Sequence, residues 1–72
     1  MTNPIRMAYE HHVAMLERSD VESHRTNAQQ IALAQLIKRR DAHASRPRKT
    51  EPYKTQWQND LAAFDALIAE LE

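Results

Sequence analysis

The sequence predicts an all-α fold, and three observations carry that prediction. The 72 residues include no glycine, so the residue that the tightest hairpin turns favour is missing. Good helix formers such as Ala, Leu, Glu, Gln and Arg are abundant, whereas Val and Ile are few. Apolar residues recur at helical spacing. We therefore expect a small three-helix domain spanning residues 1–72, formed by a helical hairpin of two longer helices and a shorter N-terminal helix.

The first helix is expected over about residues 4–18. Asn3 is a favourable N-cap, and Pro4 would occupy the first helical position, where its missing N–H costs nothing. A break is expected at Ser19, which forms a capping-box pattern with Glu22. The alternative is one continuous helix over residues 4–44.

The second helix is expected over about residues 20–44. Its first half is polar, while residues 31–37 contain a single polar side chain, Gln35. A helix that is apolar nearly all round makes contacts on more than one side. Two interpretations stay open for this segment: the central helix of a small bundle, or a helix that also contacts another chain. A core this small is marginal, and we expect a homodimer to complete it.

A basic, proline-containing linker over residues 45–51 is expected to precede a third helix over 52–72, because the residue before a proline avoids helical geometry. This helix could begin at Pro52 or at Thr55, which forms a second capping-box pattern with Gln58. Its apolar stripe steps by four and three residues through Trp57, Leu61, Phe64, Ile68 and Leu71, with Tyr53 one turn earlier and Leu67 alongside.

Charge is distributed unevenly although the formal net charge is zero. Residues 38–49 hold six basic side chains and one acidic one, and residues 50–72 hold five acidic and one basic. The six cations are Lys38, Arg39, Arg40, Arg46, Arg48 and Lys49. They can be solvated or paired with the acidic last helix, can bind an acidic protein, or can contact phosphates while Tyr53 and Trp57 stack on bases.

Several chemistries lack their usual residues in this sequence. Without cysteine there is no disulfide and no thiolate ligand or nucleophile, and without glycine there is no phosphate-binding glycine loop. The four histidines include no pair at the H-x₃-H spacing of helical zinc sites. The longest near-apolar run is far shorter than a membrane span. We expect no metal, no cofactor, no enzymatic activity and no membrane insertion, and a cytoplasmic location.

The sequence therefore predicts a non-enzymatic helical binding protein. We expect it to dock on another protein with an acidic surface and to modulate or inhibit it, in the manner of short accessory regulators carried by phages or plasmids. The expected partner-binding residues are Lys38, Arg39, Arg40, Arg46, Arg48, Lys49, Tyr53 and Trp57. The alternative is a nucleic-acid-binding module that uses the basic segment 38–49.

Overall fold

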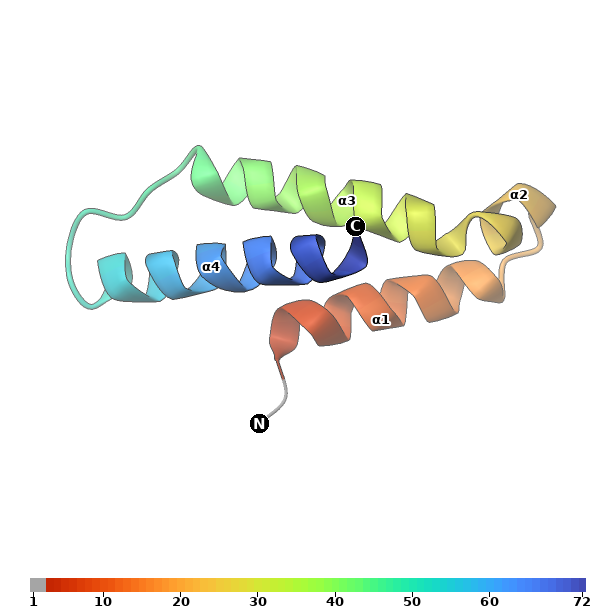
Figure 1. Ribbon diagram of the computed structural model, residues 1–72, viewed down its shortest axis with the longest axis horizontal. Helices are drawn as coiled ribbons and strands as arrows, with labels where there is room; N and C mark the ends of the chain where they lie inside the picture. Colours follow the sequence, from red (N-terminus) through yellow and green to blue (C-terminus); the bar gives the residue numbers. More distant parts are fainter. Residues whose placement is uncertain (1–2) are drawn as a thin grey trace. The chain divides into compact units, whose positions relative to one another are not determined.

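The computed structural model describes residues 3–72, which form four α-helices and no strand (Figure 1). The helices are α1 (Pro4–Glu17), α2 (Glu22–Thr26), α3 (Ala28–Ala44) and α4 (Tyr53–Leu71). The predicted all-α fold class is confirmed. The chain divides into two compact units, one extending to Gln35 and the other beginning at Leu36. The division falls within α3.

Helix α1 begins as the sequence predicts, with Asn3 as its N-cap. The Oδ1 atom of Asn3 accepts hydrogen bonds from the backbone N–H groups of Ile5, at 3.0 Å, and Arg6, at 3.4 Å. These are two of the donors that a helix start leaves without a helical partner. Pro4, at the first helical position, has no N–H to satisfy.

The predicted break near Ser19 is confirmed, but its hydrogen bonding differs from a capping box. The Oγ atom of Ser19 accepts from the N–H of Val21 at 3.1 Å, not from that of Glu22. Its carbonyl accepts from Nη1 of Arg25 at 2.6 Å. Val21 is the N-cap of α2 and supplies no side-chain cap. Ser19 therefore closes the turn itself, one residue earlier than the capping-box pattern predicts.

A second break, at Asn27, was not predicted. The expected helix over residues 20–44 is divided into α2 and α3 there, and Asn27 departs from helical geometry with φ −109° and ψ 21°. Its side-chain Nδ2 donates to the carbonyl of Ser23 at 3.0 Å, as does its backbone N–H at 3.1 Å. An asparagine side chain that bonds the local backbone competes with helical hydrogen bonding, which accounts for the short α2.

The N-terminal unit has its core where α1 meets the start of α3. Val13, Ala28 and Ala32 are buried together, and Tyr9 and Leu16 pack against them. The small side chains of Ala28 and Ala32 allow the two helices to approach closely. Tyr9, Val13 and Leu16 are four and three residues apart, a spacing that places them on one side of α1. Four large apolar side chains of the described residues stay exposed: Met7, Met15, Val21 and Tyr53.

In the C-terminal unit, α3 ends just before Pro47. The backbone N–H of Ser45 still reaches Asp41, and its Oγ donates to the carbonyl of Ala42 at 2.8 Å. After the linker, α4 runs back alongside the later part of α3 (Figure 1). The buried side chains here are Leu36 of α3 and, on α4, Phe64, Leu67 and Ile68. The apolar stripe is therefore buried in its second half.

The start of α4 corrects one prediction. Thr55 does not cap the helix, because α4 already begins at Tyr53 and Thr55 lies within its first turn. The Oγ1 of Thr55 instead donates to Oε2 of Glu51 at 2.6 Å. The N-cap, Pro52, supplies no side-chain hydrogen bond. The carbonyls of Thr50 and Pro52 accept from the first helical N–H groups, so the linker joins the helix without the predicted capping box.

Candidate functional site

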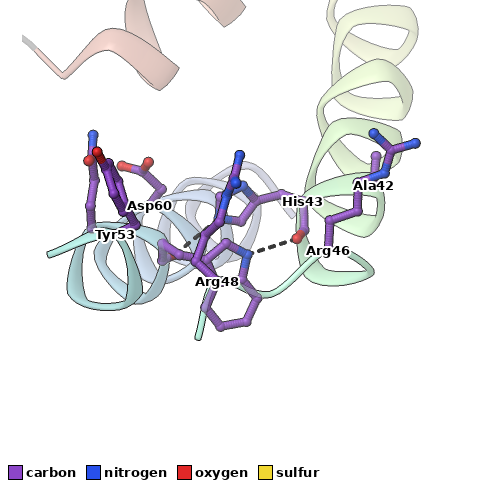
Figure 2. A pocket seen from close by; sticks show the side chains of 8 residues that line it. Ala42, His43, Arg46, Arg48, Tyr53 and Asp60 are labelled. Atoms are coloured by element: carbon purple, nitrogen blue, oxygen red, sulfur yellow. Dashed lines mark hydrogen bonds between the residues drawn. The ribbon is translucent and has the colours of Figure 1, made fainter. Parts of the chain in front are cut away.

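A pocket lies where the end of α3, the linker and the first turns of α4 meet. Its volume is about 430 Å³, and its lining residues are Ala42, His43, Arg46, Arg48, Tyr53, Gln56, Trp57 and Asp60. Figure 2 shows Tyr53 and Asp60 on one side, Ala42 and Arg46 on the other, and His43 and Arg48 between them. All eight residues belong to the C-terminal unit. The geometry of this pocket is therefore set within one compact unit.

Two reciprocal hydrogen bonds hold the back of the pocket. The indole Nε1 of Trp57 donates to the carbonyl of His43 at 2.9 Å, and Nε2 of His43 lies 3.0 Å from the carbonyl of Trp57. Because a carbonyl oxygen can only accept, His43 carries a proton on Nε2. The His43 carbonyl lies in the last turn of α3 and also accepts from the backbone N–H of Arg46 at 3.2 Å. The Trp57 side chain is therefore a second donor to this carbonyl at the helix end, and it joins the two helices.

The rings of these two residues also stack. The His43 and Trp57 ring centroids lie 5.4 Å apart with planes 16° from parallel. The ring of Phe64 lies 5.6 Å from that of His43 at a tilt of 46°. Phe64 is buried, while His43 and Trp57 are half-buried. The pocket wall is thus continuous with the buried part of the unit, which favours a rigid wall.

Two arginines line the pocket without a carboxylate partner. Arg46 and Arg48 are exposed, and within residues 3–72 neither guanidinium forms an ion pair or a side-chain hydrogen bond. Pro47 between them fixes one backbone dihedral of the segment that carries them. A guanidinium presents several N–H donors in a planar fork, which suits carboxylates and phosphates. This part of the pocket can therefore bind an anion.

The opposite side of the pocket carries an aromatic ring and a carboxylate. Tyr53 is 59% exposed, so nothing in the described chain covers most of its surface. Asp60, seven residues after Tyr53 on α4, is half-buried and forms no ion pair within the described residues. Tyr53 therefore does not extend the buried part of the apolar stripe. Its position leaves the ring available to a ligand.

The remaining predicted cations do not line this pocket. Arg40 bonds Asp65 of α4 at 2.9 Å and Asp41 at 2.7 Å. The hydrogen bond that Arg40 donates to Asp65, followed by the one that it donates to Asp41, raises the pKa of Arg40 above its ordinary value. The guanidinium carbon of Arg39 lies 5.5 Å from the centre of the Phe64 ring, a cation–π distance. Arg39 and Arg40 thus have intramolecular contacts, one of the alternatives that the sequence left open.

Four of the eight sequence-predicted residues come together in one place. Arg46, Arg48, Tyr53 and Trp57 line the pocket, whereas Lys38, Arg39, Arg40 and Lys49 do not. The pocket also contains residues that the site prediction did not include: Ala42, His43, Gln56 and Asp60. The sequence gives no direct signal for them, because their position depends on how α4 packs on α3. The closest signal in the sequence is a histidine in the last turn of α3, which precedes a helix with aromatic residues near its start.

Comparison with other proteins identifies no relative of this chain. No known protein family, curated protein or solved structure matches this chain. In residues 3–72 no helix combines the length and apolar character that crossing a membrane requires. Nor do three or more His, Asp or Glu side chains of that same range gather in a position to hold a metal ion.

Proposed function

We propose that this chain is a non-enzymatic binding protein that docks on another protein through the pocket at the α3–α4 junction. One observation carries the proposal: Arg46 and Arg48, both without a carboxylate partner in the described chain, lie in the same pocket as the exposed ring of Tyr53. Protein interfaces are enriched in Arg, Tyr and Trp. An acidic surface on the partner would supply the missing carboxylates.

The rigid wall of the pocket supports this function. Trp57 is held by its two hydrogen bonds to His43 and by ring stacking, so ordering it costs little when a partner binds. A surface that is already ordered gains affinity because less conformational entropy is lost. The arginines would attract and orient the acidic partner, and Tyr53 would contribute apolar contact area beside them.

Docking would modulate or inhibit the partner by covering part of its surface. That mode suits a short binding protein without catalytic machinery, such as the accessory regulators carried by phages and plasmids. The proposal also includes self-association, because Leu33 and Ile37 of α3 are only half-buried. Sedimentation equilibrium tests this part: a dimer is expected, and a monomer at high protein concentration would remove it.

Nucleic-acid binding is the second candidate, and the same two arginines favour it. Phosphates would bind Arg46 and Arg48 while a base stacks on Tyr53. Asp60 argues against it, because a carboxylate in the pocket repels a polyanion. Arg40 also argues against it, since Asp41 and Asp65 already balance its charge. The distinguishing property is salt dependence, which is steep and uniform for phosphate contacts.

Affinity capture from a bacterial lysate, with and without nuclease, tests the proposal. The tagged chain should retain a stoichiometric protein after nuclease treatment. The Arg46→Glu, Arg48→Glu double variant should lose it, because the pocket would then repel an acidic surface. Arg18→Glu with Lys54→Glu is the matched control, since it changes the net charge equally at two residues outside the pocket lining. It should still capture the protein.

Two results would overturn the proposal. Recovery of nucleic acid, or of proteins that disappear on nuclease treatment, would support the nucleic-acid alternative. Equal capture by the pocket variant and the control variant would show that binding occurs elsewhere on the chain.

A further inference from the structure

We propose that the pocket recognises a mixed-charge segment, in which an acidic and a basic side chain of the partner bind at opposite sides of the pocket. This inference rests on the proposed protein-binding function and specifies the chemistry of the partner. It follows from the pocket's division into a cationic side and an anionic, aromatic side.

The cationic side is formed by Arg46, which lies across the pocket from Tyr53 and Asp60, and by Arg48, which lies between the two sides (Figure 2). Both line the pocket, and within residues 3–72 no carboxylate pairs with either. This separates them from Arg40, whose guanidinium is already held by Asp41 and Asp65. The N–H donors of a guanidinium match the two oxygens of a carboxylate. The acidic side chain of the partner is therefore expected here.

The opposite side is formed by Asp60 and Tyr53, which lie together in Figure 2. Asp60 has no ion-pair partner in the described chain although Arg46 and Arg48 line the same pocket. The Tyr53 ring is mostly exposed. A carboxylate beside an open aromatic face attracts an ammonium or guanidinium group, by charge and by cation–π interaction. The basic side chain of the partner is therefore expected on this side.

A ligand of a single sign would fit this pocket less well. A purely acidic segment would bring a carboxylate towards Asp60, and a purely basic one would bring a cation towards Arg46 and Arg48. Like charges brought together on binding oppose association and select against wrong partners. The same argument selects against a polyphosphate backbone. A segment with both charges satisfies both sides of the pocket at once.

Three capped tripeptides test this inference with the whole chain. Acetyl-Glu-Ala-Lys-amide is the mixed-charge probe, since alternate side chains of an extended peptide point the same way. Acetyl-Glu-Ala-Glu-amide and acetyl-Lys-Ala-Lys-amide are the single-sign controls. Trp57 is the only tryptophan and lines the pocket, so its indole N–H resonance reports binding by NMR even at millimolar affinity. The mixed peptide should bind about fivefold more tightly than either control, the factor that one exposed ion pair provides.

The Asp60→Asn variant, which keeps the side chain's size, provides the second measurement. This variant should bind the acidic peptide and the mixed-charge peptide with equal affinity, because the substitution removes both the repulsion and the attraction at Asp60. If the variant keeps the wild-type preference, the cationic group does not bind at Asp60 and the inference is wrong.

The peptide results separate this inference from the proposed function. Equal or tighter binding of the acidic peptide by the wild-type chain would overturn the mixed-charge inference and leave acidic-partner binding standing. Tightest binding of the basic peptide, or no shift of the indole resonance with any peptide, would overturn both.

Discussion

The side chain of Trp57 donates a hydrogen bond to the backbone of His43, and the side chain of His43 donates one to the backbone of Trp57. This exchange joins the last turn of α3 to the first half of α4. It also places the indole in the wall of the pocket. The same pair of residues therefore stabilises the C-terminal unit and shapes its candidate binding site.

Removing either donor should weaken the fold measurably. Trp57→Phe keeps an aromatic ring but loses Nε1–H, and His43→Phe keeps a ring but loses Nε2–H. Each should lower the free energy of unfolding by about 1 kcal/mol, the typical net contribution of one hydrogen bond. Urea unfolding followed by circular dichroism measures this. Unchanged midpoints in both variants would mean that the exchange does not stabilise the protein.

Truncating the two aromatic side chains of the pocket, Trp57 and Tyr53, should change the stability of the protein by different amounts. Trp57→Ala removes the stacking and the hydrogen bond together and should cost about 2 kcal/mol or more. Tyr53→Ala removes a mostly exposed ring and should change stability by less than about 0.5 kcal/mol, while weakening partner capture. Thermal unfolding of the two variants gives the comparison. A large loss of stability for Tyr53→Ala would show that its ring is a structural element.

The N-cap of α1 offers an independent test of the N-terminal unit. Asn3→Ala removes the acceptor for the N–H groups of Ile5 and Arg6 and should cost about 1 kcal/mol. Asn3→Asp is the control, since aspartate also accepts these bonds and should preserve stability. Helical circular dichroism during urea unfolding reads both. Equal stability of the alanine and aspartate variants would contradict the cap.

The ion pair between Arg40 and Asp65 should contribute little and depend on salt. Both side chains are substantially exposed, at 31% and 53%, and exposed pairs are weak. Arg40→Ala should lower the unfolding midpoint slightly at low salt. The difference should vanish near about 1 M salt, where charges are screened over a few ångströms. A difference that persists at high salt would mean that the arginine stabilises α3 by packing, not by charge.

The sequence predicts the helices well where a local signal marks them. Asn3 followed by Pro4 marks the start of α1, and the spacing of Phe64 and Ile68 marks the buried side of α4. Asn27 shows the limit of such signals. A single asparagine is tolerated in many helices, and here its amide bonds Ser23 and divides the helix. That competition depends on local geometry that a sequence pattern does not contain.

The candidate site is only partly predictable for a different reason. Counting cations identifies residues 38–49 as basic but does not separate Arg40, which pairs with Asp65, from Arg46, which has no such partner in the described chain. That separation depends on the packing of α4 against α3. The same packing brings His43 and Asp60 into the pocket. Residues far apart in the chain join a site only through tertiary contacts, so no local motif identifies them.

The most direct test of the proposed docking site is site-specific photo-crosslinking. Tyr53→p-benzoylphenylalanine places a reactive ring at the pocket, and Met15→p-benzoylphenylalanine places one on α1. The two residues are matched in exposure, at 59% and 60%. Irradiation in a bacterial lysate should give a covalent adduct with another protein from position 53 and not from position 15. An adduct with a different protein from position 15 alone, or with nucleic acid from position 53, would contradict the account.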